Sequence, residues 1–408
     1  MTSVALPAIW LIVLIVGLPQ FSETVYTPSL PDIAQALQAS ESMVEFTLTI
    51  YLFGFAIGTL FWGKLSDKLG RKPCVIAGLF IFIAGCIGCY FSSNITLLMT
   101  SRFIQAFGGS IGSVLGQAIC RDAFHGPRLG KVYSSIGSAL AIFPAIGPVV
   151  GGVIAEHLGW PFIFLFLTCC ALILAMLVSS HLPETHDKGN RQPTSIMDIA
   201  YKLVRDKKVI GFGLIVAACN GISFSYFAEG SFYLIKGFGL SPSEYGLSFI
   251  AIATATMMGG ILSKKLHNSR ASQSIMGYGL RIILTATAVF SGFSLINHSL
   301  VPLSNGLMIA ITIMSQMVLM FGVCMTTSNA LALALVDYKW CIGTASSLFG
   351  FFYYCLISLF TLGMGFLHNG TLLPMPLYFL SIAAFTLMVQ RITITKKDKA
   401  IAPLSAEA

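Results

Sequence analysis

The sequence predicts an all-α membrane protein in which twelve transmembrane helices form two six-helix bundles. Three observations predict this fold: twelve apolar segments of bilayer length, basic loops that follow alternate segments, and one polar stretch that divides the segments into six and six. Of the 408 residues, 56% are hydrophobic and only 10% are charged, a composition that excludes an ordinary soluble domain.

Each apolar segment is long enough for a helix to cross a bilayer. A helix rises about 1.5 Å per residue, so about 30 Å of hydrocarbon requires about 20 apolar residues. Lipid offers the backbone no hydrogen-bond partners, which favours helices. The predicted spans cover residues 6–27, 44–62, 73–93, 97–119, 131–156, 160–180, 209–229, 244–263, 280–299, 303–325, 341–366 and 372–391.

Basic residues gather on one side of the predicted membrane. Of the 24 Lys and Arg residues, 22 lie in five alternate loops or the C-terminal tail, whereas Arg102 lies in a span and Lys236 in an opposite loop. Basic loops stay in the cytoplasm, so we expect a multi-pass protein of the bacterial inner membrane with both termini cytoplasmic. The net charge of +8 then reflects topology, and we expect no nucleic-acid partner.

A polar stretch with two prolines separates the two sets of six spans. We therefore expect an N-terminal six-helix bundle, a cytoplasmic linker, a C-terminal six-helix bundle and a cytoplasmic tail, with the limits 1–180, 181–208, 209–395 and 396–408. The first apolar run lacks the basic start of a cleavable signal peptide, so we expect it to be a retained span.

The end of the linker has two possible structures. Residues 194–208 form either a short amphipathic helix on the membrane surface or a solvated linker. In the helical case Ile196, Ile199 and Leu203 share one side, and the basic residues suit an anionic leaflet.

The polar residues do not form a catalytic or metal-binding pattern. Cys86 and Cys89 have a C-x-x-C spacing, but they lie in an apolar helix without histidine or acidic neighbours, which favours a packing role. A P-loop or Rossmann pattern in its strand–turn–helix context is also missing. We expect a protein that is not an enzyme and needs no metal or cofactor.

The loop between the second and third spans carries a specific motif. Residues 63–73 read GKLSDKLGRKP, which resembles the signature G-x-L-A/S-D-R/K-x-G-R-R/K of the major facilitator superfamily. Glycines permit a tight turn, and the acid can pair with a cation or accept bonds from a helix N-terminus. The resemblance implies the two-bundle fold of that superfamily. It also implies that Gly63, Asp67, Gly70 and Arg71 hold the halves together in the outward-facing state.

The fourth span carries a second motif of the same superfamily. Residues 102–108 read RFIQAFG, which resembles R-x-x-Q-x-x-G, and the span ends with Arg121 and Asp122. A charge within the membrane is costly and usually functional, and the resemblance implies that Arg102 takes part in proton coupling. Gln105 follows one turn later and is a candidate for binding substrate. The alternative is that Arg102 only reaches from the helix end to the interface.

The fifth span resembles the antiporter motif G-P-x-x-G-G of proton-coupled exporters. Residues 144–152 read PAIGPVVGG. Proline removes a helix hydrogen bond and glycine removes side-chain bulk, so the helix can bend and pack closely. The resemblance implies that this segment closes one end of the cavity, a conformational role that we assign to Gly147, Pro148, Gly151 and Gly152. The alternative is an ordinary kinked span.

The first span carries an acidic residue near its end. Residues 23–31 read ETVYTPSLP, which partly resembles D-x-Y-L-P-x-L-P of the Bcr/CflA drug:proton antiporters, with glutamate in place of aspartate and the tyrosine one position later. Because the apolar run before it is too short to span alone, we expect the helix to continue past Glu23. Glu23 is then a candidate for both proton coupling and substrate binding, and Tyr26 for substrate binding.

The seventh span offers a second intramembrane carboxylate, Glu229. It either faces the cavity, opposite Glu23, or lies at the outer interface. Adaptable aromatic and thioether side chains suit amphiphilic substrates, although core and lipid-facing side chains look the same in sequence. The candidates for binding substrate in this half are Tyr226, Glu229, Met317, Phe321 and Tyr353. The acids expected at the external surface are Asp32, Glu41, Glu45, Glu156 and Glu244.

These features favour a secondary transporter that exports a small organic molecule in exchange for protons by alternating access. Its expected partners are the substrate, protons and the lipid bilayer, and we expect a monomer. Three alternatives remain: an exporter of a specific endogenous metabolite such as a siderophore, a proton-coupled importer, and a membrane sensor without transport. The antiporter motif argues against the importer, and the short loops argue against the sensor.

Overall fold

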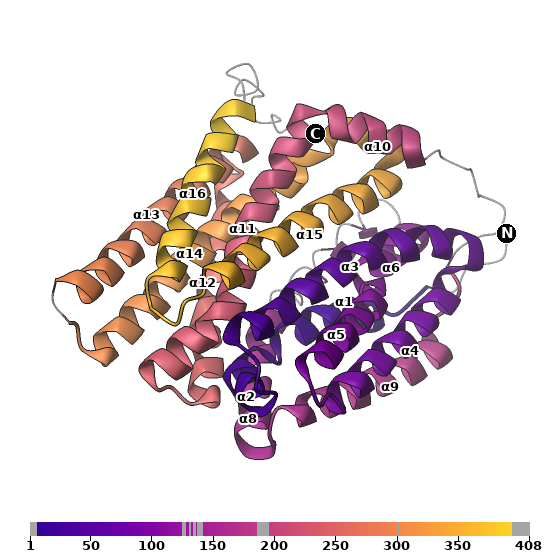
Figure 1. The fold of residues 1–408 in the computed structure, drawn as a ribbon. Coiled ribbons are helices and arrows are strands. Elements are labelled where there is room, and N and C mark those ends of the chain that lie inside the picture. Colours follow the sequence, from indigo (N-terminus) through magenta and orange to yellow (C-terminus); the bar gives the residue numbers. More distant parts are fainter. Residues whose placement is uncertain are drawn as a thin grey trace. The chain divides into compact units, whose positions relative to one another are not determined.

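The computed structural model of the protein describes residues 6–124, 128–129, 132–133, 136, 142–185, 196–300 and 302–393 (Figure 1). In this part of the chain the regular elements are helices, and none is a strand. Eleven helical segments of the described residues have the length and apolar composition of a membrane span. The predicted all-α membrane fold is confirmed.

The described residues fall into two compact units. The first comprises Met1–Ser195 with Ser241–Phe249, and the second comprises Ile196–Leu240 with Ile250–Ala408. The predicted domain limits stay a prediction, and the tail 396–408 lies outside the described residues, as do residues 186–195 of the linker.

The first unit begins with a span built from three short pieces. Its helices are α1 (Ile9–Thr24), the 3-10 turn η1 (Thr27–Ser29), α2 (Leu30–Ala36), α3 (Glu41–Leu69), α4 (Arg71–Tyr90), α5 (Ile95–Gly109), α6 (Ile111–Ala123), α8 (Phe143–Leu158) and α9 (Pro161–His181). As expected, the first span continues past Glu23, and it reaches Ala36 through η1 and α2.

The second unit contains α10 (Ile196–Arg205), α11 (Lys207–Ser231), the π-helical segment η3 (Phe232–Lys236), α13 (Ser272–Ser299), α14 (Asn305–Ala334), the 3-10 segment η4 (Val336–Cys341), α15 (Ile342–Leu367) and α16 (Pro374–Thr393). Helix α12 (Pro242–Leu266) contributes its first residues to the first unit and the rest to the second.

Two predicted spans differ in their details. The fourth is broken into α5 and α6 at Ser110, whose hydroxyl donates to the carbonyl of Phe107 at 2.8 Å, just after two glycines. Such a bond competes with the helix ladder, and glycine has a low helix propensity. The fifth predicted span, 131–156, begins on residues that are largely outside the described part, and α8 is the portion seen, with 16 residues.

Each unit contains a pair of helices that meet with a glycine of one helix against a glycine of the other. A Cβ added to Gly108 of α5 would lie 2.7 Å from the carbonyl oxygen of Gly78 in α4. In the second unit a Cβ added to Gly279 of α13 would lie 2.7 Å from the carbonyl oxygen of Gly322 in α14. Small residues allow such close approach between helices in a membrane. The two units therefore share a packing device between the third and fourth helices of each predicted bundle.

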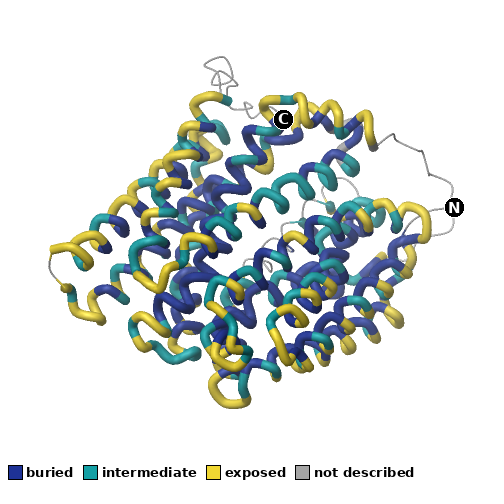
Figure 2. Tube along the Cα trace, in the orientation of Figure 1, coloured by how far each residue is buried: buried dark blue, intermediate teal, exposed yellow. Residues whose placement is uncertain are grey.

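Figure 2 distinguishes the buried from the exposed residues along the helices of each unit. Large side chains such as Phe80, Met176 and Phe366 are exposed, although they belong to membrane-length helices. A water-soluble protein would rarely carry so much exposed apolar surface, whereas lipid accommodates it.

Asp206 fixes the start of α11. Its Oδ1 accepts hydrogen bonds from the backbone N–H groups of Lys208 at 2.9 Å and Val209 at 3.4 Å, and its Oδ2 accepts one from the Tyr338 hydroxyl at 3.0 Å. One carboxylate thus caps α11 and ties it to η4.

We predict that Asp206→Ala lowers the stability of the second unit. Loss of a helix cap costs about 1 kcal/mol, and the buried Tyr338 hydroxyl also loses its acceptor. Thermal unfolding in detergent should show a lower Tm. Tyr338→Phe removes only the tyrosine bond and should lower the Tm less. Equal effects of the two variants would contradict a capping role.

Candidate functional site

Arg102 is enclosed by aromatic rings in the interior of the first unit. Its side chain is fully buried, and Cζ lies 4.0 Å from the centre of the Tyr26 ring and 4.1 Å from that of Tyr51. The alternative that Arg102 reaches the interface is therefore wrong. Helix α5 starts at its Asn94 cap, where Oδ1 accepts from the Leu97 N–H at 2.9 Å, so Arg102 lies two turns inside.

A chain of polar contacts continues from Arg102 into α4. Arg102 Nη1 donates to Gln105 Oε1 at 2.5 Å, and Gln105 Nε2 donates to Cys86 Sγ at 3.0 Å. The Tyr26 hydroxyl shares a hydrogen bond with Thr47 at 3.2 Å. Arg102 Nε and Nη2 have no hydrogen-bond partner among the described residues. The guanidinium is therefore stabilised mainly by ring faces and one amide.

Glu23 lies in the last turn of α1 and is also buried, with 5% of its surface exposed. Its Oε1 has no hydrogen-bond partner among the described residues, and the charge of Arg102 acts on it. The structure thus brings together four of the predicted residues: Tyr26, Arg102 and Gln105 are in contact, and Glu23 lies within their electrostatic reach. We name Glu23, Tyr26, Tyr51, Arg102 and Gln105 the arginine cluster.

The glycine–proline segment of α8 packs directly beside this cluster. A Cβ added to Gly147 would overlap the Thr24 hydroxyl, and one added to Gly151 would overlap the Val25 carbonyl oxygen. Thr24 and Val25 immediately follow Glu23 in the chain. Helix α8 therefore contacts the turn that ends α1.

The same segment also packs against the first turn of α12. A Cβ at Gly152 would overlap the Pro242 carbonyl, and a Cβ at Gly246 would overlap that of Pro148. All four predicted α8 residues, Gly147, Pro148, Gly151 and Gly152, are buried within this first unit.

Arg71 holds together the end of α3, the start of α4 and the end of α6. Its Nη1 donates to Asp67 Oδ1 at 2.7 Å and to Ser66 Oγ at 2.7 Å, and its Nε donates to Asp122 Oδ2 at 2.8 Å. The Asp67 side chain is 62% exposed and that of Asp122 only 23%. Arg121, the other predicted residue here, occupies the last turn of α6.

One turn residue connects α3 to α4. Gly70 has a φ of 106°, a conformation that favours glycine, so its predicted role in the turn agrees with the structure. For Gly63 the expected turn is wrong: it lies within α3, which continues to Leu69, because a single residue suffices to reverse the chain.

Of the two roles left open for Asp67, the structure shows the ion pair, and the N-terminus of α4 has another acidic partner. Glu184 accepts the N–H of Arg71 at 2.9 Å and that of Lys72 at 3.1 Å, whereas Asp67 pairs with the guanidinium. A carboxylate at a helix N-terminus is favourable because it meets free N–H groups and the positive end of the dipole.

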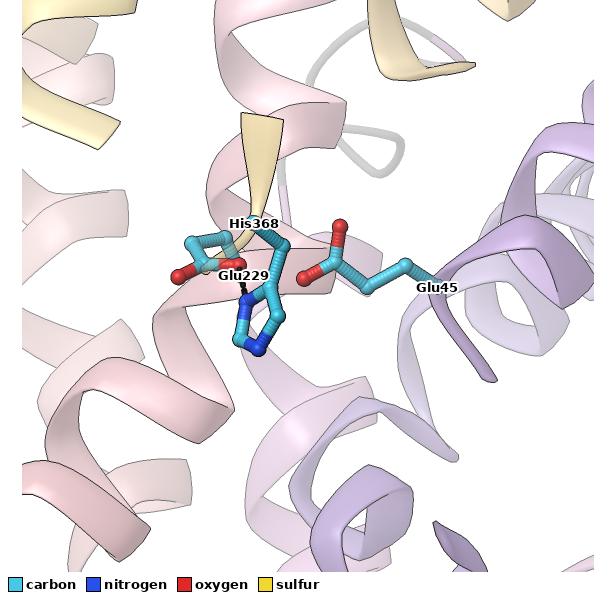
Figure 3. Close-up of side chains that lie close together, drawn as sticks. All are labelled: Glu45, Glu229 and His368. Carbon is cyan, nitrogen blue, oxygen red and sulfur yellow. Dashed lines mark hydrogen bonds and ion pairs between the residues drawn. The ribbon is translucent and has the colours of Figure 1, made fainter. Parts of the chain in front are cut away.

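In the second unit Glu229 pairs with a histidine. Glu229 Oε2 lies 2.8 Å from Nδ1 of His368, which follows α15 (Figure 3). Glu229 is buried, with 2% of its surface exposed. Tyr226 is also buried, and the remaining predicted substrate residues, Met317, Phe321 and Tyr353, are half-buried. Whether Glu229 and Glu23 face one cavity stays a prediction.

Of the acids expected at the surface, Asp32, Glu156 and Glu244 are exposed and Glu41 is half-buried. For Glu45 the prediction is wrong, because it is fully buried. Glu45 lies one turn into α3, inside the predicted span 44–62 and on the side that also carries the buried Leu48 and Leu52, so its position on the helix accounts for its burial.

Comparisons with known proteins identify the family. Residues 12–362 match the Major Facilitator Superfamily. The chain belongs to the Major Facilitator Superfamily. It is therefore a multi-pass membrane transporter, and the superfamily that residues 63–73 indicated is confirmed.

Relatives cover nearly the whole chain. An uncharacterized transporter of Rickettsia felis is 35% identical over 89% of this chain and 90% of its own. A bicyclomycin resistance protein homolog of Haemophilus influenzae is 29% identical over 82% of both chains, and the multidrug resistance protein MdtL of Shewanella oneidensis is 26% identical over 92% of both. These relatives support the resemblance to drug:proton antiporters of the superfamily.

A solved structure has the same fold. The inward-facing, occupied bacterial homolog of the human lysosomal transporter Spinster aligns with a TM-score of 0.74 at 16% identity, covering 97% of this chain and 98% of that one. At this identity the likeness extends to the superfamily fold alone.

For this superfamily member we predict that Gly151→Ala impairs transport through packing. A methyl group there would overlap the Val25 carbonyl, and overpacking typically costs about 1–3 kcal/mol. Transport in whole cells should fall and Gly151→Leu should abolish it, with membrane expression checked by immunoblot. The control is Gly292→Ala in α13, where an added Cβ meets nothing within 4 Å. Normal transport by Gly151→Leu would exclude close packing as the reason for glycine here.

We also predict that Asp122→Asn impairs transport more than Asp67→Asn. Each substitution removes a negatively charged partner of Arg71. An ion pair shielded from water contributes more to stability than one whose acid is 62% exposed, as Asp67 is. Accessibility of residues on the two sides of the membrane, measured by thiol labelling, should shift further in Asp122→Asn. The reverse order would mean that Asp67 has a role beyond this ion pair.

Proposed function

We propose that this transporter exports small organic molecules, drugs among them, in exchange for protons. The observation that carries the proposal is the position of Glu23: a buried carboxyl group within the electrostatic reach of a buried arginine, one residue before the turn on which α8 packs. The names of the relatives in Haemophilus influenzae and Shewanella oneidensis, which refer to bicyclomycin and multidrug resistance, support drugs as substrates.

The arginine cluster offers a way to bind and release a proton. Desolvation disfavours a charged carboxylate, while a nearby guanidinium favours it. Because the two influences oppose each other, any molecule that displaces Arg102 or enters beside Glu23 alters the affinity for the proton. A proton and a substrate that compete for one site produce antiport, since each must leave before the other binds.

The contact between α8 and the end of α1 connects proton binding at Glu23 to movement of the backbone. Thr24 and Val25 have no clearance from Gly147 and Gly151, so a shift of the α1 turn upon protonation must be followed by α8. We propose that this is how the charge state of Glu23 changes the closure of the cavity. Tyr26 and Gln105 would contact substrate in the first unit, and Tyr226, Glu229, Met317, Phe321 and Tyr353 in the second.

The proposal includes the setting of the protein: the bacterial inner membrane, both termini in the cytoplasm, a monomer, and the proton gradient in place of a cofactor. Export of one endogenous metabolite and proton-coupled import are the other candidates. An efflux screen of antibiotics and cationic dyes in a pump-deficient host separates a multidrug exporter from a narrow one. Proton flux in vesicles upon substrate addition gives the direction of coupling.

We predict that Glu23→Gln abolishes proton-coupled export while the protein still folds and binds substrate. The amide keeps the shape but cannot titrate. In proteoliposomes, substrate addition to the wild type should move protons across the membrane, and addition to Glu23→Gln should not.

Two variants make the Glu23 experiment specific. Glu229→Gln removes a proposed substrate contact from the second unit, so it should weaken substrate binding, whereas proton movement at saturating substrate should persist. Arg102→Lys keeps the charge but loses the planar stacking on two rings, so it should shift the pH at which export is half-maximal. Unaltered coupling in Glu23→Gln would exclude Glu23 as the proton carrier.

A further inference from the structure

Helix α10 carries more apolar surface than the protein covers. Ile199 and Leu203 are buried, and the helix contacts α11 and α15. Three other large apolar side chains, Met197, Tyr201 and Val204, remain 79%, 56% and 70% exposed. Because they are four and three residues apart, they form one stripe along the helix. We name Met197, Tyr201 and Val204 the exposed stripe.

The exposed stripe does not point the same way as the buried side. With about 100° of turn per residue, it lies about 140° around the helix from the buried pair, and Ala200 lies between the two. The charged residues Asp198, Lys202 and Arg205 occupy the remaining arc. A helix that faces water on its outer side would have polar residues there. The buried pair of α10 faces protein, and the exposed stripe requires another apolar environment on the opposite side of the helix.

Positive charge borders the exposed stripe. Arg205 Cζ lies 4.0 Å over the ring of Tyr201, and the exposed Lys207 and Lys208 follow it in the chain. The carboxylate of Asp206 is directed inward, to the N-terminus of α11 and to Tyr338. A tyrosine beside arginine and lysine is typical of the boundary between acyl chains and headgroups.

We propose that α10 lies in the membrane surface on the side of the basic loops and binds anionic phospholipid. The exposed stripe lies among the acyl chains, and Arg205, Lys207 and Lys208 contact the headgroups. Negative headgroups complement this charge, and apolar chains complement the stripe. A solvated helix or a protein partner would place water or protein at the same positions.

The consequence for the second unit is mechanical. Only Asp206 separates Arg205, the last residue of α10, from Lys207, the first residue of α11, and Asp206 bonds to both α11 and η4. Lipid bound to α10 therefore acts at the start of the helix that carries Glu229.

Photocrosslinking of the full-length protein tests the orientation of α10. p-Benzoylphenylalanine replaces Tyr201 in one variant and Lys202, on the charged arc of the same helix, in the other. Both are illuminated in nanodiscs of phosphatidylcholine and phosphatidylglycerol, and adducts are identified by mass spectrometry. We expect phospholipid adducts at position 201 at several times the level at position 202. Equal levels, or adducts with protein alone at position 201, would overturn the proposal.

Hydrogen exchange tests the role of the charges. We expect amides 196–208 of the wild type to exchange several-fold more slowly in nanodiscs containing phosphatidylglycerol than in phosphatidylcholine alone. Combined Arg205→Glu and Lys207→Glu should abolish this difference, whereas Arg270→Glu, in an exposed turn after α12, should preserve it. Exchange that is the same in both lipids for the wild type would exclude anionic headgroups as the ligand.

Discussion

A positive charge buried in the first unit sets the arrangement around it. Insertion measurements put the cost of an arginine at the centre of a membrane helix at about 3 kcal/mol. A cation over an aromatic face recovers about 2 kcal/mol when both are shielded from water. The two tyrosine faces at 4.0 and 4.1 Å are therefore enough to offset the cost of Arg102. Helices α3 and α5 and the turn after α1 must stay in register to supply them.

The turn at the end of α1 has contacts on both sides. Toward the arginine cluster it presents Glu23 and Tyr26, and toward α8 it presents Thr24 and Val25, which exclude any side chain at Gly147 and Gly151. Residues three apart share one side of a helical turn and the two between them lie on the other, so this single turn serves two neighbours.

Much of this architecture could be predicted from sequence because its signals are local. The membrane spans follow from runs of apolar residues, and the Arg71–Asp67 pair follows from a spacing of four across the Gly70 turn. The prediction for Gly63 was wrong for a local reason as well, because helix α3 continues past this first glycine of the motif to Leu69.

The partners that were missed lie far away in the chain. Tyr51 and Cys86 belong to α3 and α4, Glu184 comes 113 residues after Arg71, and His368 comes 139 residues after Glu229. A tyrosine or cysteine in an apolar helix looks like any packing residue until the neighbouring helix is in place. The one available signal was the acid at 184 and the histidine at 368, each a polar residue just after a span.

The glycine crossings of α4 with α5 and of α13 with α14 give each unit a spar, which we define as a pair of helices that meet with a glycine of one helix against a glycine of the other. A spar resists bending, because any bend separates or collides the two backbones. Deformation within a unit is then left to helices with a break in their ladder: α1 at Pro19 and after Thr24, α8 at Pro148, and α11 where it passes into the π-helical η3. The two carboxylates Glu23 and Glu229 both lie on these bendable helices, and neither lies on a spar.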